Sequence, residues 1–181
     1  MPGEAGVWVF VIGDMLIFAL LFAVFVFYRA QDVPLFAASQ TSLNQACGAF
    51  NTLLMLTSSW FVAHAIHAAR AGLGKWVTRF FALAFICGAA FIAVKYFEYG
   101  AKLRAGYTIT TNDFYMYYYL LTGLHLIHVA IGMGVLSFVW TTARAGVFDE
   151  RTVNVLESGA TFWPMVDVLW IVVFALLYLM R

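Results

Sequence analysis

GVWVFVIGDMLIFALLFAVFVFYR, residues 6–29, contains one charged side chain, Asp14, before it ends at Arg29. A helix that crosses the hydrocarbon core of a bilayer needs about 20 mostly apolar residues. Four further stretches of the chain have the same character. We therefore predict membrane-spanning helices at about residues 6–29, 44–69, 77–99, 115–142 and 159–180.

The composition agrees with a lipid environment. Of the 181 residues, 64% are hydrophobic and 10% are charged, whereas soluble domains are about 45–50% apolar and about 25% charged. The alternating ten-residue pattern of membrane β-strands is absent, and the net charge of +1 gives no reason to expect nucleic acid. We predict an all-α integral membrane protein, a five-helix bundle forming a single membrane domain over residues 1–181 with no soluble domain.

The segments between the spans contain the Gly, Pro, Asp and Asn residues typical of loops. We expect loops at residues 29–42, 70–76, 100–113 and 143–157. An odd number of spans places the termini on opposite sides of the membrane. With a cytoplasmic N-terminus, five Lys and Arg residues lie inside and four outside, which favours that orientation. MPGEAG, residues 1–6, has no basic stretch, so we expect no cleaved signal peptide.

Polar side chains inside the spans are candidates for function, because they are costly in lipid. Asp14 and Asp167 are each predicted to lie about 12 Å from the inner ends of their helices. His128 is predicted about 21 Å from the inner end, or less where its long helix extends beyond the lipid, and tilt changes each depth by several ångströms. These three side chains can therefore share a layer. We interpret them, with His125, as a buried polar network. A structural role and a role in proton supply both remain open.

Lys95 and Glu98 lie three residues apart on one helix face, near the outer end of the third span. We predict an interfacial ion pair between them, with Lys95 snorkelling toward the membrane surface.

The histidines form two pairs, His64 with His67 and His125 with His128. The pairs are predicted to differ in depth by about 15 Å, and each supplies two ligands where zinc usually needs three or four. We therefore expect no metal site, although one axial histidine is enough for haem. The two cysteines form no CxxC motif and are interpreted as packing residues.

Four segments resemble subunit III of the haem-copper oxidases. FYMYYYLLTGLHLIHVAIGMG, residues 114–134, resembles the family segment FYxLTGxHGxHVxxG, and ATFWPMVDVLWIVVFALLYL, residues 160–179, resembles the last helix, YWHFVDxVWLxLFxxxYL. Residues 6–29 resemble the helix carrying SE, with Asp14 where Glu usually stands. KYFEYGAKL, residues 95–103, resembles QxxEYxxA, with Lys in place of Gln. The similarity covers the whole chain in order.

The resemblance implies a non-catalytic subunit of a respiratory complex in the bacterial inner (cytoplasmic) membrane. Such a subunit holds no haem or copper and packs against catalytic subunit I, which holds haem and copper or iron. It supports assembly, binds phospholipid and sustains proton uptake. The short chain and PGEAGVWVFVIGDM, residues 2–15, most resemble the five-helix NorE branch associated with nitric oxide reductase. Pro164 stands where the family has His, and we expect it in the first turn of the last span.

Two other functions remain open from the residues alone. A small transporter or channel would use the intramembrane carboxylates, although no inverted repeat is evident. A self-contained redox enzyme would bind haem on the histidines. Small residues spaced by four, Ala84 with Gly88 and Ala130 with Gly134, predict close helix contacts. The resemblance favours the accessory subunit, for which we expect no catalytic residue in this chain.

Overall fold

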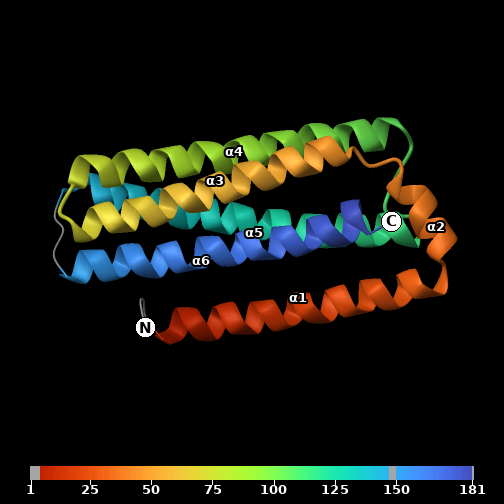
Figure 1. Cartoon of the computed structure of the whole chain (residues 1–181), viewed down its shortest axis with the longest axis horizontal. Helices are drawn as coiled ribbons and strands as arrows, with labels where there is room; N and C mark the ends of the chain where they lie inside the picture. Colours follow the sequence, from red (N-terminus) through yellow and green to blue (C-terminus); the bar gives the residue numbers. More distant parts are fainter. Residues whose placement is uncertain (1–4, 147–149, 181) are drawn as a thin grey trace.

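The computed structural model describes residues 5–146 and 150–180. Long helices lie side by side along one axis, and a short helix caps one end of the bundle (Figure 1). In order, the elements are α1 (Ala5–Gln31), α2 (Val33–Gln40), α3 (Gln45–Arg70), α4 (Gly74–Arg104), α5 (Asp113–Arg144), α6 (Glu150–Phe174) and a π-helical turn, η1 (Ala175–Leu179). Within the described residues, five helices are long and apolar enough to cross a membrane. The predicted all-α membrane class is confirmed.

Local sequence signals determine where the long helices begin and end. The side chains of Asn44 and Asn112 accept backbone N–H bonds at the starts of α3 and α5, which satisfies donors that a helix start leaves unpaired. Gly72 and Gly106 follow two residues after the ends of α3 and α4, with φ angles of 69° and 83°. Glycine adopts this left-handed conformation at little cost, so the chain can reverse within a few residues.

The segment expected as a loop at residues 29–42 contains α2, so that prediction is wrong in part. The Asp32 carboxylate accepts the N–H of Leu35 at 3.1 Å, and Pro34 occupies the first turn. Both features favour helix initiation. Phe36 of α2 is buried and packs edge-on to Phe25 of α1, with ring centroids 5.7 Å apart. α2 therefore ties the C-terminal end of α1 to the bundle.

The expected loop at residues 143–157 is also shorter than predicted, because α6 begins at Glu150. The polar segment at residues 150–158 extends the helix beyond its apolar part. Pro164 consequently lies inside α6 rather than in its first turn. Proline has no N–H, so Ala160, four residues earlier, lacks the usual helical donor to its carbonyl.

Helices α3 to α6 enclose the core, and α1 lies along the outside of α6 (Figure 1). Two buried tryptophans of α6 fill the space between these helices. The indole N–H of Trp163 donates to the Ser58 hydroxyl at 3.0 Å, and that of Trp170 donates to the Thr52 hydroxyl at 3.0 Å. These bonds satisfy the indoles inside the bundle and fix their orientation.

Glycines at the core permit close packing against Trp163. A Cβ on Gly132 would lie 2.8 Å from two atoms of the Trp163 ring, and a Cβ on Gly88 would lie 3.0 Å from another. The expected close contact at Gly88 is therefore present. The pair Ala130 and Gly134 does not behave as predicted: both residues are exposed, and a Cβ on Gly134 would meet nothing within 4 Å.

Candidate functional site

The first polar cluster joins α1 to α5 through Asp14 and His128. The Nε2 atom of His128 lies 3.0 Å from both carboxylate oxygens of Asp14 and is hydrogen-bonded to Oδ1. Each side chain is 11% exposed. Phe18, one turn along α1, packs edge-on against the imidazole with ring centroids 5.2 Å apart. The pair is thus held in a largely apolar setting between two spanning helices.

The other ring nitrogen of His128 determines how many protons this pair holds. Nδ1 lies 2.8 Å from the carbonyl oxygen of Leu124. Because a carbonyl can only accept, Nδ1 carries a hydrogen. The contact between Nε2 and Asp14 then needs a second proton, which sits on the imidazole or on the carboxyl group. The pair therefore shares one transferable proton.

Asp167 and His125 do not join this pair. Asp167 is 4% exposed, and neither of its oxygens has a hydrogen-bond partner among the described residues. His125 is fully buried, and its two ring nitrogens lack hydrogen-bond partners in the same part of the chain. It packs against the rings of Phe91 and Trp170 at centroid distances of 5.6 and 5.1 Å. Within the described residues, His125 therefore takes no part in the predicted polar network, because aromatic rings pack against it.

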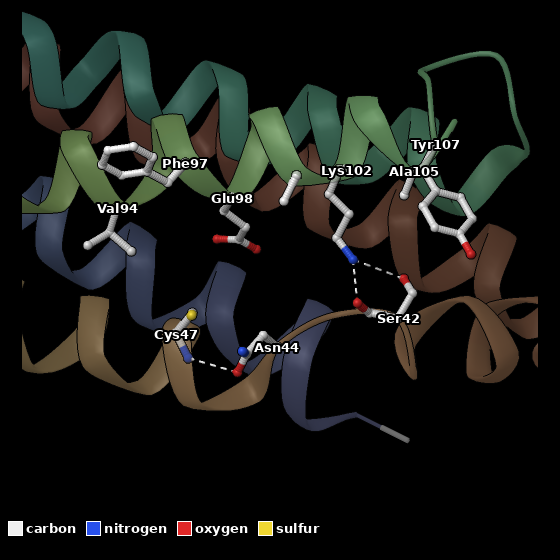
Figure 2. Close-up of a pocket in the computed structure, with 10 residues that line it drawn as sticks. Ser42, Asn44, Cys47, Val94, Phe97, Glu98, Lys102, Ala105 and Tyr107 are labelled. Atoms are coloured by element: carbon white, nitrogen blue, oxygen red, sulfur yellow. Dashed lines mark hydrogen bonds between the residues drawn. The ribbon is translucent and has the colours of Figure 1, made fainter.

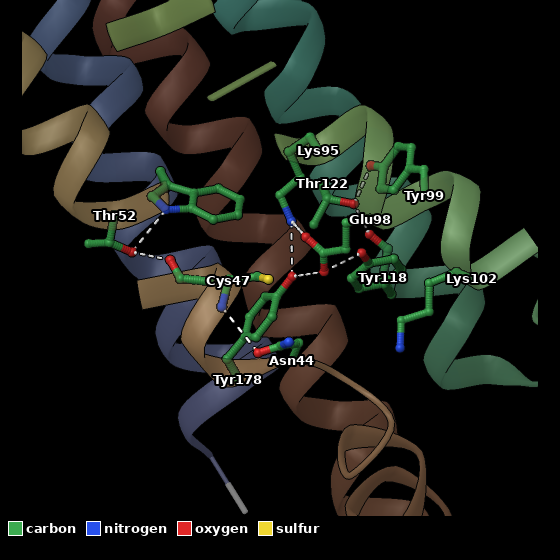
Figure 3. A network of polar contacts seen from close by, with 12 residues as sticks. Asn44, Cys47, Thr52, Lys95, Glu98, Tyr99, Lys102, Tyr118, Thr122 and Tyr178 are labelled. Atoms are coloured by element: carbon green, nitrogen blue, oxygen red, sulfur yellow. Dashed lines mark hydrogen bonds and ion pairs between the residues drawn. The ribbon is translucent and has the colours of Figure 1, made fainter. Parts of the chain in front are cut away.

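The second cluster surrounds Lys95, whose ammonium group donates to the Glu98 carboxylate at 2.8 Å and to the Tyr178 hydroxyl at 2.9 Å (Figure 3). The other carboxylate oxygen of Glu98 accepts hydrogen bonds from Tyr118 at 2.9 Å and from Tyr178 at 2.5 Å. The cluster therefore links α4 and α5 to the π-helical turn η1. Because the ammonium group and both carboxylate oxygens have hydrogen-bond partners, the desolvation cost of the ion pair is offset.

Aromatic rings complete the environment of the Lys95 cation. Its Nζ lies 4.7 Å from the ring centre of Trp170, 5.3 Å from that of Tyr178 and 5.8 Å from that of Tyr118. The predicted pairing with Glu98 is present, but the predicted snorkelling is wrong, because Lys95 is 1% exposed and turns into the bundle. The sequence does not predict the hydrogen bonds from Tyr118 and Tyr178, because their positions in the sequence do not indicate that they face Lys95 and Glu98.

A pocket of about 480 Å³ opens beside Glu98, between the start of α3 and the end of α4. Figure 2 shows Glu98 and Lys102 directed toward it. The ammonium group of Lys102 donates to the carbonyl of Ser42 and, at 3.1 Å, to its hydroxyl. Apolar side chains, including Val94 and Phe97, also line the pocket. The pocket therefore places the Glu98 carboxylate and the Lys102 ammonium group beside an apolar wall.

The remaining histidines, His64 and His67, lie elsewhere, near the C-terminal end of α3. The ring centroids of His64 and His67 are 6.5 Å apart, and His64 packs on Trp60 at 4.2 Å. In the described parts of the chain, no three His, Cys, Asp or Glu side chains gather where they could hold a metal ion. The geometry there is that of aromatic packing on one helix face.

Comparison with known proteins identifies the family. The family model for cytochrome c oxidase subunit III matches residues 3–181. The chain belongs to this subunit III family. It is 34% identical to cytochrome c oxidase subunit 3 of Synechocystis sp. over 198 residues, covering 99% of this chain and 81% of the relative. It is 28% identical to the same subunit of Thermostichus vulcanus over 176 residues, covering 97% and 86%.

A ubiquinol oxidase subunit is also related. Cytochrome bo(3) ubiquinol oxidase subunit 3 of Buchnera aphidicola is 25% identical over 175 residues, covering 96% of this chain and 84% of the relative. The predicted resemblance to subunit III of the haem-copper oxidases is thereby confirmed. The chain is an integral membrane, non-catalytic subunit that associates with a catalytic subunit I. Members of the family carry no redox cofactor themselves, and membership stands against the transporter and haem-enzyme alternatives.

Proposed function

We propose that this subunit III supports proton uptake by its catalytic partner through the Asp14–His128 pair. One observation carries the proposal: Nδ1 of His128 is committed to the Leu124 carbonyl, so the 3.0 Å contact between Nε2 and Asp14 needs a shared proton. Such a proton can move between an imidazole and a carboxyl group without any rearrangement of the helices. A residual exposure of 11% leaves the pair reachable from outside the bundle.

Its position also supports this role. α1 is the outermost helix of the bundle (Figure 1), and its other faces are exposed and apolar. Leu16 and Leu20 are among the exposed residues. The Asp14–His128 pair lies on the inward face of α1, so it is one helix away from whatever covers the outer face. A catalytic subunit packed there would therefore find a proton-holding group close to the interface.

The test uses the purified oxidase complex with Asp14→Asn in this subunit. Asn cannot accept a proton, so we expect turnover to fall severalfold at alkaline pH, where protons are scarce, and less at acidic pH. Asp113→Asn is the matched control, because Asp113 is exposed in the first turn of α5. The proposal fails if both variants keep the turnover and pH profile of the unmodified complex.

We also propose the finer features of the complex that the sequence predicts. The chain lies in a bacterial inner membrane with its N-terminus in the cytoplasm, and its partner reduces oxygen or nitric oxide. The copurified complex, assayed with each acceptor in turn, distinguishes the two. A periplasmic location of an N-terminal tag, shown by protease access in intact spheroplasts, would contradict the orientation.

A phospholipid headgroup is the proposed occupant of the pocket between Glu98 and Lys102. The support is the combination of opposite charges with an apolar wall formed by Val94 and Phe97. Lipid retained by the purified complex can be measured by mass spectrometry. We expect Lys102→Met to lower it and Lys75→Met, on an exposed residue at the opposite end of α4, to leave it unchanged. Equal lipid content in both variants would contradict this assignment.

A further inference from the structure

A separate pocket runs between α1, α3 and α6 toward the end of the bundle where α3 finishes. Its volume is about 440 Å³, and Ser59 and Arg70 are among the α3 residues that line it. At 1.5 Å per residue, these two positions are about 16 Å apart along the helix. The pocket therefore connects the end of a spanning helix with a level well inside the bundle.

The mouth of this pocket is polar. Arg70 and Glu157 form an ion pair at 2.8 Å, and the Arg70 side chain is 56% exposed. His67 and Thr161 also line the pocket. Glu157, Thr161 and Pro164 follow one another at helical spacing on one side of α6. Charged and hydroxyl groups at a helix end are suited to contact with water rather than with acyl chains.

The deep end contains polar groups without hydrogen bonds. The Ser59 hydroxyl is buried, lines the pocket and has no hydrogen-bond partner among the described residues. Asp167 follows the pocket-lining Pro164 by three residues, so its side chain lies on the same side of α6, one turn deeper. Its carboxyl group is buried beside Ser59, although the two do not meet in hydrogen-bonding geometry. Ala160 also lines the pocket, and Pro164 cannot supply the usual helical donor to its carbonyl.

The energetic cost of these groups favours water at this position. A buried polar group left unpaired is destabilising, and an unpaired buried carboxylate is more so, which favours the protonated form of Asp167. A water molecule occupies about 30 Å³ in the liquid and binds well where two to four polar groups converge. Ser59 and Ala160 line the pocket of about 440 Å³, and the Asp167 carboxyl group lies beside Ser59, so polar groups converge at its deep end.

We propose that this pocket is a hydrated inlet through which Asp167 exchanges its carboxyl proton with the aqueous phase at the Arg70 end of the bundle. In the exchange, the O–H proton of Asp167 passes to a water molecule that the Ser59 hydroxyl holds in place, and a proton from the water chain returns to the carboxyl group. Net charge and oxidation state do not change. The inlet does not depend on the role proposed for Asp14 and His128, because no hydrogen bond joins Asp167 to either.

The experiment measures hydrogen–deuterium exchange at Asp167 in the purified oxidase complex by infrared spectroscopy. The carboxyl C=O band that is lost in Asp167→Asn identifies the group. After transfer to D₂O, we expect this band to shift to lower frequency within the first spectra recorded. Absence of the band, or an unshifted band after prolonged incubation, overturns the proposal. An acyl chain in the pocket would produce the second result, because it keeps the carboxyl group dry.

Two variants test the route itself. Ala63→Phe places a ring in the pocket from an exposed position on α3 that lines it, and Ser59→Ala removes the hydroxyl beside Asp167. We expect each to slow the exchange at least about tenfold, which corresponds to about 1.4 kcal/mol in the barrier. Ala49→Phe, at an exposed position of α3 that does not line the pocket, is the matched control. Exchange as fast in Ala63→Phe and Ser59→Ala as in the control would overturn the inlet.

Discussion

His128 of α5 presents its Nε2 atom to the carboxylate of Asp14 on α1 at 3.0 Å, across the interface between the two helices. This contact replaces hydration for two ionisable side chains, and it is a polar link between α1 and α5. Loss of either partner should therefore be detectable both in the retention of the subunit and in the supply of protons to the complex.

Substitution of His128 tests the structural part of this relationship. His128→Leu removes the partner of Asp14 and leaves a buried carboxyl group unpaired, which costs about 1–3 kcal/mol, or more if the group is charged. His128→Gln keeps a side-chain donor and should cost less. The measurement is the temperature at which the subunit dissociates from the purified complex. Equal dissociation temperatures for the two variants would contradict the assigned contact.

The buried ion pair predicts a difference between single and double variants. Glu98→Leu leaves the Lys95 cation without its carboxylate, and breaking a buried pair in this way costs about 3–5 kcal/mol. Lys95→Met combined with Glu98→Leu removes both charges and should recover much of that loss. Thermal unfolding of the complex measures both. A double variant no more stable than Glu98→Leu would show that the pair is not coupled as the 2.8 Å contact indicates.

The packing of Trp163 predicts opposite results at two nearby glycines of α5. Gly132→Ala places a Cβ 2.8 Å from the ring of Trp163, which cannot easily move because its N–H is bonded to Ser58. Overpacking of this kind costs about 1–3 kcal/mol. Gly134→Ala meets nothing within 4 Å and should be neutral or slightly stabilising. Retention of both variants in the complex at equal temperatures would contradict this packing.

The aromatic environment of His125 predicts that an apolar side chain can replace it. Its ring lies between Phe91 and Trp170, and its nitrogens lack hydrogen-bond partners among the described residues. His125→Phe should change the free energy of unfolding by no more than about 1 kcal/mol. His125→Gln buries an amide without partners and should cost about 1–3 kcal/mol. Greater loss of stability in the Phe variant than in the Gln variant would indicate a polar role for this histidine.

The spanning helices and the Asp14–His128 contact could be predicted from the sequence by simple means. Long apolar stretches such as residues 6–29 have no alternative to a membrane helix, and the rise of 1.5 Å per residue brings Asp14 and His128 to similar depth. Depth does not determine the direction in which a side chain points around its helix axis. For that reason Asp167 was also expected in the same network, although the structure leaves it beside Ser59.

Other features depend on three-dimensional neighbours that spacing does not reveal. Lys95 could reach the membrane surface or the bundle interior, and the rings of Trp170, Tyr118 and Tyr178 determine the outcome. The helix at Val33–Gln40 follows a recognisable Asp32 cap and Pro34, but it is too short for the apolar pattern to indicate. The early start of α6 at Glu150 was missed because hydropathy locates the membrane-buried part of a helix rather than its polar extension.

The most direct test of the whole account is affinity purification of this chain in mild detergent, followed by an optical spectrum and turnover assays. We expect a haem-bearing catalytic subunit to copurify, and complexes that lack the chain to lose turnover faster at alkaline pH than complete complexes. If no haem protein copurifies, and deletion of the chain leaves oxygen and nitric oxide turnover unchanged, the account is contradicted.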